Sequence, residues 1–249
     1  MKKPYLSVII PAYNEAKRLP LTLIDIDKHL ATVNFDYEII VVDNNSSDAT
    51  LEIAQRFIPL IKNLKVIECK IQGKGAAVKK GILEAKGEIR LFTDADNSTS
   101  IDHFFKMEPY FKEGYEVVIG SRDVPGAQLD PPQPWYRNLL GDLGNIFIQL
   151  MVLKGIKDTQ CGFKAFSEKA ALSIFPLSEI KGWGFDVEIL ALARKMGYKI
   201  KEIPVHWVNS SFSHVKPSAY LNVLLEVVKI KIRLMRNKYG IENQSRKSA

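Results

Sequence analysis

The sequence predicts an α/β fold built on a mainly parallel sheet with helices on both faces. Short runs rich in valine, isoleucine and leucine alternate with longer amphipathic stretches through the first 120 residues. The expected strands are 6–10, 37–42, 64–68, 89–93 and 116–120, and the expected helices between them are 15–30, 47–57, 74–85 and 101–111. Ligands bind beyond the carboxyl ends of strands in such sheets, so functional residues are expected directly after each strand.

The second half of the chain is less regular. Residues 124–134 contain four prolines and predict a loop whose length is typical of a mobile lid. Further along, we expect a helix over 135–153, a loop and strand over 158–166, a helix from Trp183 to about Met196, a strand over 198–207 and a final helix over 219–238. The expected organisation is one catalytic domain, 1–218, followed by a basic amphipathic helix and tail, 219–249.

Composition narrows the class of protein. The 249 residues can bury a substantial core, and two cysteines form neither a disulfide framework nor a zinc cluster. A net charge of +7 favours an anionic partner, which could be a nucleic acid, a phosphorylated substrate or a membrane surface. No nucleic-acid-binding motif is recognised, so that partner is not expected. An apolar run near the N-terminus ends at Pro11, too early for a signal peptide, and we expect a cytoplasmic protein.

Two short motifs follow expected strands. Asp94-Ala-Asp96 presents two carboxylates on a turn, an arrangement that favours Mg²⁺ or Mn²⁺ shared with substrate phosphates, although such pairs also occur by chance in loops. Gly73-Lys74-Gly75 opens a helix, where backbone amides and a lysine suit an anion, or where the lysine is simply solvated. Neither a Walker motif nor a dinucleotide-binding glycine pattern is present, which disfavours kinases, ATPases and dehydrogenases.

Taken together, the motifs resemble those of a known family. The order and spacing of family-two glycosyltransferases with the GT-A fold are matched by Ser7-Val-Ile-Ile-Pro-Ala-Tyr-Asn-Glu15, Val41-Val-Asp-Asn-Asn-Ser-Ser-Asp-Ala-Thr50, Gly73-Lys-Gly75, Phe92-Thr-Asp-Ala-Asp96 and Gly120-Ser-Arg122. The later segments 155–164, 182–190 and 202–207 are similar to dolichyl-phosphate glucosyltransferases and their prokaryotic relatives. The resemblance covers roughly residues 5 to 235, nearly the whole chain.

This resemblance implies a donor site for a nucleotide sugar. It assigns Pro11, Tyr13 and Glu15 to the nucleotide pocket and Asp43 to the uracil edge. Lys74 would approach the base or the diphosphate, and Asp94 would lie near the ribose and the metal. Asp96 is the implied main ligand of an Mg²⁺ or Mn²⁺ ion that bridges both phosphates and stabilises the departing nucleoside diphosphate.

The implied acceptor is a polyprenyl or dolichyl phosphate held by Arg122 and Arg137, because the planar fork of arginine suits a phosphate. Surface ion pairs are the alternative for both arginines. Either His214 or Lys216 would contact the same anion, or His214 is a plain loop residue. The phosphate nucleophile is already anionic, so it needs orientation more than deprotonation. The side chains expected to assist catalysis are first Asp158 and then Asp186, which could instead form a turn and a helix first turn.

The end of the chain concentrates the positive charge. Residues 226–249 hold seven lysines and arginines against two glutamates, a net of +5, which leaves +2 for the rest. One interpretation of helix 219–238 is an amphipathic helix lying in an anionic membrane interface. The other is a C-terminal helix packed on the sheet with its lysines in water. The first interpretation predicts peripheral association with the cytoplasmic face of a membrane.

The function predicted from these features is metal-dependent, inverting transfer of a hexose, expected to be glucose from UDP-glucose, to dolichyl or polyprenyl phosphate. One alternative is a mannosyltransferase that uses GDP-mannose, and another is a family-two enzyme that extends a polysaccharide or glycoprotein glycan. The signature Gln-x-x-Arg-Trp of processive synthases is absent. A non-enzymatic alternative is a nucleotide-sugar-binding regulator, which the intact Asp94 and Asp96 disfavour.

Overall fold

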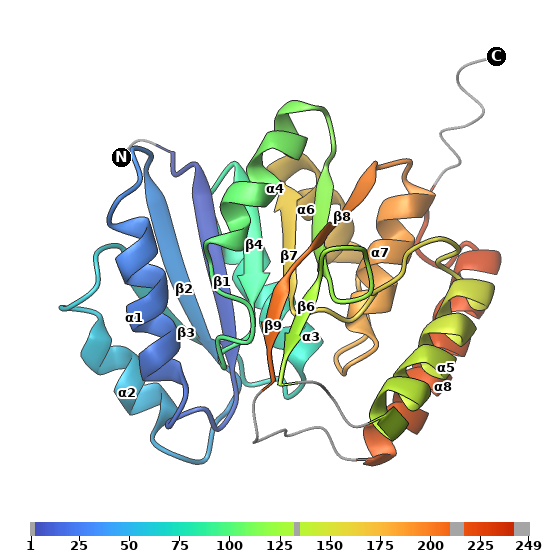
Figure 1. The fold of residues 1–249 in the computed structure, drawn as a ribbon, viewed down its shortest axis with the longest axis horizontal. Coiled ribbons are helices and arrows are strands. Elements are labelled where there is room, and N and C mark those ends of the chain that lie inside the picture. The colour runs from blue at the N-terminus through green and yellow to red at the C-terminus, as the bar shows by residue number, and fades with distance from the viewer. Residues whose placement is uncertain (1–2, 132–134, 210–216, 242–249) are drawn as a thin grey trace.

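The computed structural model describes residues 3–131, 135–209 and 217–241. Its centre is a seven-stranded sheet in the order β3-β2-β1-β4-β7-β5-β8 (Figure 1). The strands are β1 (Leu6–Ala12), β2 (Tyr37–Asp43), β3 (Leu64–Glu68), β4 (Ile89–Thr93), β5 (Val117–Ser121), β7 (Phe163–Ser167) and β8 (Ile200–Pro204). Neighbouring strands are parallel except at β7, which runs antiparallel to both β4 and β5. The predicted mainly parallel sheet is therefore confirmed, with one strand reversed near its middle.

Helices cover both faces of the sheet. They are α1 (Leu19–Leu30), α2 (Thr50–Phe57), α3 (Lys74–Glu84), α4 (His103–Lys112), α5 (Trp135–Met151), α6 (Glu168–Ile174), α7 (Phe185–Lys195) and α8 (Pro217–Met235), with a short 3-10 turn over Phe175–Leu177. Apolar residues of α1, α2 and α4 pack in one core, and those of α3, α6 and α7 pack in the other. In β1, Val8 and Ile10 face the first core while Ile9 faces the second, which explains the unbroken apolar run of this strand.

The first helix begins later than the sequence pattern predicts. The expected start at Glu15 is wrong, because residues 15–18 form a turn in which the amide of Leu19 donates to the carbonyl of Glu15 at 2.9 Å. Helix α1 then starts at Leu19 and has a proline in its first turn, where the missing N–H costs nothing. The turn keeps Glu15 close to the end of β1 instead of carrying it along the helix.

Two predictions for the second half are wrong in detail. The expected loop over 124–134 contains a short strand, β6 (Gln128–Asp130), while residues 132–134 lie outside the described part. The expected strand over 198–207 is two strands, β8 and β9 (His206–Val208), and β9 pairs with β6. Val205 lies between β8 and β9. Its amide donates to the carbonyl of Ser121 in the large sheet, and its carbonyl accepts from the amide of Gln128 in β6, so the chain passes from one sheet to the other at this residue.

Helix α8 has two different apolar faces. Val223, Val227 and Ile230 are buried in the core, and the helix packs against α5 and α7. The opposite face exposes Leu221, Leu225, Ile232 and Met235. Figure 1 shows α5 and α8 side by side at one end of the molecule. Within residues 3–131, 135–209 and 217–241, no helix combines the length and the hydropathy that crossing a bilayer requires.

Candidate active site

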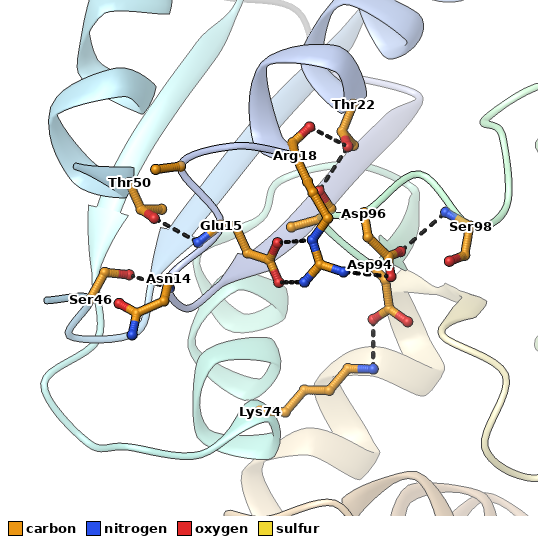
Figure 2. Close-up of polar contacts among 12 residues, drawn as sticks. Asn14, Glu15, Arg18, Thr22, Ser46, Thr50, Lys74, Asp94, Asp96 and Ser98 are labelled. Carbon is orange, nitrogen blue, oxygen red and sulfur yellow. Dashed lines mark hydrogen bonds and ion pairs between the residues drawn. The ribbon is translucent and has the colours of Figure 1, made fainter. Parts of the chain in front are cut away.

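The carboxyl ends of the strands bring the predicted donor-site residues together. Strand β1 pairs with β2 on one side and β4 on the other, and all three are parallel. The segments that follow them, 13–15, 44–46 and 94–96, therefore meet at one edge of the sheet. Figure 2 shows side chains from these segments in one region, together with Lys74 from the start of α3, which contacts Asp94.

Asp43 is the last residue of β2, and only one oxygen of its buried carboxylate accepts a hydrogen bond within the described residues. Its Oδ2 accepts from the amide of Ser46 at 3.2 Å, while Oδ1 is buried with no hydrogen-bond partner among the described residues. Leaving a carboxylate oxygen unpaired in the protein interior is costly, so the site fits a ligand that brings an N–H donor. A small pocket opens here, lined by Asp43, Asn45, Ser46, Leu51, Glu68, Cys69 and Lys70.

Asn44, which had not been singled out from the sequence, fixes the loop beside this pocket. Its Nδ2 donates to the carbonyls of Cys69 and Ile71 at 3.1 and 2.7 Å, and its Oδ1 accepts from the amide of Gly73 at 2.8 Å. Gly73 has a φ of 127°, and a Cβ there would lie 2.2 Å from the carbonyl oxygen of Lys181. Only glycine fits this conformation and this space. The loop conformation therefore places Lys74 at the first residue of α3.

Arg18 joins Glu15 to Asp96, as Figure 2 shows. Its Nε and Nη2 donate to the two carboxylate oxygens of Glu15 at 2.6 and 2.5 Å, and its Nη1 lies 3.4 Å from Oδ2 of Asp96. The carboxylate of Glu15, which the resemblance assigned to the nucleotide pocket, is therefore engaged by an arginine. The three-residue spacing of Glu15 and Arg18 was the only signal for this pair in the sequence.

Lys74 pairs with the other aspartate of the motif. Its Nζ lies 2.6 Å from Oδ1 of Asp94 and 5.3 Å from the ring centre of Trp183. Burial favours the neutral amine, but Asp94, Asp186 and Asp96 outweigh it and raise the pKa of Lys74. The carboxylate of Asp94 also fills the space at Gly162, where a Cβ would lie 1.9 Å from Oδ2.

The two aspartates suit a divalent cation. Burial, and then repulsion by Asp94, raise the pKa of Asp96, and a bound cation would relieve both effects. Across the described residues, no cluster of three or more His, Cys, Asp or Glu side chains could hold a metal. Two carboxylates with the remaining ligands from phosphates and water are the arrangement that Mg²⁺ favours. The residues therefore fit a metal shared with a bound diphosphate.

Arg122 and Asp158 lie on the other side of β7 and form a bidentate ion pair. Nε and Nη2 of Arg122 donate to Oδ2 and Oδ1 of Asp158 at 2.7 and 2.9 Å, and the guanidinium lies over Trp207. Asp158 also accepts from the amides of Arg122, Gln160 and Cys161. Burial raises the pKa of Asp158, but Arg122 more than offsets this and holds it at about 2. A carboxylate with so low a pKa is a poor proton acceptor at neutral pH.

Asp186, the second expected catalytic side chain, is bound to a buried lysine. Nζ of Lys164 lies 2.6 Å from Oδ1 of Asp186 and donates to the carbonyl of Cys161 at 2.5 Å. Burial raises the pKa of Asp186, and Asp94 adds to the increase, although Lys164 and Lys74 oppose it. Lys164 was not singled out from the sequence, because one lysine within an apolar strand gives no signal for its partner.

The remaining predicted residues differ in what can be said of them. Pro11 lies in β1 and Tyr13 follows the strand with 43% of its surface exposed, so both stand beside the donor site. Arg137 lies on α5, but its side chain is outside the described structure. His214 lies outside the described residues. Its expected contact with the acceptor, like that of Arg137, stays a prediction.

Comparisons with known proteins agree with this arrangement. The family described as Glycosyl transferase family 2 matches residues 7–175. A dolichyl-phosphate beta-glucosyltransferase of Dictyostelium discoideum is 38% identical, over 96% of this chain and 77% of that protein. The human protein of the same name is 32% identical, over 97% of this chain and 79% of its own.

The solved structures support the fold. Glucosyl-3-phosphoglycerate synthase from Mycobacterium tuberculosis, in complex with Mn²⁺, UDP and glucosyl-3-phosphoglycerate, superposes with a TM-score of 0.67. It is 19% identical and the match covers 97% of this chain and 82% of that one. Another structure of this synthase contains Mg²⁺ and UDP. The predicted GT-A fold is thereby confirmed. This chain belongs to glycosyl transferase family 2 and, within it, to the dolichyl-phosphate β-glucosyltransferases.

Proposed function

We propose that this protein transfers glucose, with inversion, from UDP-glucose to the phosphate of dolichol or a related polyprenol. The observation that carries the proposal is the donor edge of the sheet, where Asp94 and Asp96 follow β4 and Asp43 ends β2 with a carboxylate oxygen that has no hydrogen-bond partner among the described residues. The relatives named above supply the sugar and the acceptor. Their identities of 38% and 32% over most of both chains make the same reaction the simplest assignment.

For the donor, Asp43 offers Oδ1 as an acceptor for the N–H of a uracil ring. Asp94 and Asp96 would hold Mg²⁺ or Mn²⁺, which supplies Lewis-acid stabilisation of the charge on the departing UDP. Lys74 adds a permanent positive charge beside Asp94 because its pKa is raised. Arg18 keeps Asp96 in place through its contact with Oδ2. These groups together bind a nucleoside diphosphate rather than a neutral sugar.

For the acceptor, a phosphate oxygen attacks the anomeric carbon. The new bond joins that oxygen to C1 of glucose, the bond from C1 to the UDP oxygen breaks, and UDP leaves with its electron pair. A phosphate monoester is anionic near neutrality, so the protein has to orient it and does not need a strong base. Asp158 holds Nε and Nη2 of Arg122, so Nη1 is the nitrogen through which Arg122 would bind the phosphate. We assign Asp158 to positioning this arginine.

Arg137 and His214 are proposed as further contacts of the acceptor phosphate. Asp186 is proposed as the second candidate, after Asp158, for a side chain that assists catalysis by accepting a proton, because its pKa is raised and it interacts electrostatically with Lys74 and Asp94. Both proposals rest on the family resemblance and on chemistry. Substitution of each residue, with the KM for dolichyl phosphate and for UDP-glucose measured separately, distinguishes an acceptor contact from a donor contact.

The lipid acceptor requires access to a membrane, for which α8 is the proposed contact. Exposed Lys229 lies one turn after exposed Leu225 on this helix, and exposed Arg236 directly follows the end of the helix. Apolar side chains bordered by basic ones favour an anionic membrane interface. We propose that the protein binds peripherally at the cytoplasmic face, where its nucleotide-sugar donor would be available.

The direct test is incubation with radiolabelled UDP-glucose, Mn²⁺ and dolichyl phosphate in detergent, followed by extraction of labelled lipid. Labelled glucosyl lipid that is stable to alkali but released by mild acid is the expected product. GDP-mannose is tested in parallel, since mannosyl lipid formed in preference to glucosyl lipid would favour the mannosyltransferase alternative. Absence of lipid product with both donors, from protein that is folded by circular dichroism, would contradict the proposed function.

A further inference from the structure

A glycine-flanked tryptophan lies beside the donor site. The turn of residues 182–184, Gly-Trp-Gly, leads into α7, and Trp183 is 37% exposed. Its indole lies over the ammonium group of Lys74, which in turn contacts Asp94. Cation–π contact restricts a lysine that would otherwise sample many rotamers. A shift of the 182–184 turn would therefore move Trp183 and change the position of the Lys74 side chain.

Both glycines of the turn leave space for one carboxylate, that of Glu226 in α8. A Cβ at Gly182 would lie 2.8 Å from Oε1 of Glu226, and a Cβ at Gly184 would lie 2.6 Å from Oε2. Gly184 has a φ of −75°, which any residue adopts, so its backbone conformation does not require glycine. Glycine is required at this position because the carboxylate of Glu226 leaves no space for a side chain. The amide of Gly184 donates to Oε2 at 2.8 Å and closes the contact.

The other side of this turn is held by the start of α3. The amide of Gly75 donates to the carbonyl of Lys181 at 2.9 Å, and a Cβ at Gly75 would lie 2.6 Å from Cβ of Phe185. The segment that carries Trp183 is thus fixed between α3, which carries Lys74, and α8, which carries Glu226. Removal of the Glu226 contact would leave the turn attached on one side only.

We propose that Glu226 is a positioning residue for the donor site. Its carboxylate holds the 182–184 turn, the turn holds Trp183 over Lys74, and Lys74 keeps its place on Asp94 beside the diphosphate. This role rests on the proposed function, because it assumes that a nucleoside diphosphate binds at Asp94 and Asp96. It assigns to α8 a part in donor binding in addition to any contact with a membrane.

The test is calorimetric titration of UDP, in the presence of Mn²⁺, into the full-length wild type and variants. Glu226→Ala is expected to weaken UDP binding about five-fold, in line with the loss of a partly desolvated cation–π contact. Glu226→Gln is expected to restore binding to within about two-fold, because its amide oxygen still accepts from Gly184. Asn222→Ala, one turn earlier on α8 and exposed, is the matched control and should bind UDP as the wild type does.

A double-mutant cycle separates positioning from general loosening of the fold. Trp183→Ala alone should weaken UDP binding as much as Glu226→Ala, and the double variant should lose nothing further, because both changes break the same chain of contacts. Fully additive losses, or equal binding by wild type and Glu226→Ala, would overturn the inference. If Glu226→Ala does not fold, the inference is tested by Trp183→Ala alone, and unchanged UDP binding by this variant would overturn it. Failure of the wild type itself to bind UDP would instead contradict the proposed function.

Discussion

Arg122 and Asp158 form a bidentate ion pair, with Nε and Nη2 at 2.7 and 2.9 Å from the two carboxylate oxygens. From the sequence, the arginine was expected at the acceptor phosphate and the aspartate in catalysis, as separate contributions. Their contact indicates one unit in which the carboxylate orients the guanidinium. The guanidinium carbon of Arg122 also lies 4.9 Å from the ring centre of Trp207, a cation–π contact that further restricts the arginine.

The ion pair predicts a pH-dependent contribution to stability. The pKa of Asp158 is about 2 in the folded protein, below the value of about 3.9 expected for an unfolded aspartate. A carboxyl with a lowered pKa stabilises the fold above about pH 4, and this stabilisation is lost as the pH falls toward about 2. Asp158→Asn should therefore lower the free energy of unfolding by about 2–3 kcal/mol near neutrality and by progressively less below about pH 4.

Urea unfolding of the wild type and Asp158→Asn across this pH range gives the difference directly. Glu52→Gln removes an exposed carboxylate from a surface pair with Arg56 and serves as the control, with little change expected at any pH. A stability difference for Asp158→Asn that is independent of pH would show that the lost hydrogen bonds, rather than the charge, account for the effect.

The metal site predicts a loss of turnover without a loss of fold. Asp96→Asn keeps the shape of the side chain but removes the charge that a divalent cation needs, so kcat should fall by about 100-fold or more. Chelation of the wild-type enzyme with EDTA should abolish transfer, and added Mn²⁺ or Mg²⁺ should restore it. Initial rates at increasing Mn²⁺ measure both effects. Undiminished turnover by Asp96→Asn would remove Asp96 from the metal site.

Asp43 predicts opposite effects on stability and on donor binding. Its buried Oδ1 has no hydrogen-bond partner in the described structure, so replacing the carboxylate by an uncharged amide should not lower the melting temperature. The same change should weaken UDP binding about ten-fold or more, because a carboxylate accepts an N–H more strongly than an amide does. Scanning calorimetry and UDP titration of Asp43→Asn measure the two quantities. A variant with a lower melting temperature and unchanged UDP affinity would show that Asp43 is structural.

The outer face of α8 predicts membrane binding that can be removed selectively. Leu221 and Leu225 are 63% and 54% exposed, so glutamate at both positions should cost little stability while opposing an anionic surface. Flotation with vesicles of phosphatidylcholine and phosphatidylserine should show at least a several-fold loss of bound protein. Leu60→Glu changes a leucine that is 71% exposed elsewhere and should float as the wild type does. Equal flotation of all three proteins would contradict a membrane role for α8.

The sequence by itself determined the layered fold and much of the donor site. Runs of apolar residues such as 37–43 report burial on both faces, and the polar residues after them mark the strand ends. Because parallel strands end at the same edge, Asp43, Asp94 and Asp96 were expected at one edge of the sheet, and the parallel pairing of β1 with β2 and β4 puts them there. Local periodicity also predicted an amphipathic helix at α8, but it did not distinguish the apolar residues that are buried from those that are exposed.

Only the tertiary structure decided which side chains hold the site together. The pairs Arg122–Asp158, Lys164–Asp186 and Gly184–Glu226 join residues 36, 22 and 42 positions apart. The insertion of β7 between β4 and β5 is a non-local choice of the same kind, and β7 is preceded by Gly162, which makes room for Asp94. Hydrophobic periodicity records whether a residue is buried, but it contains no information about the partner. Partners are selected when distant segments pack and their buried charges and hydrogen-bonding groups must be satisfied together.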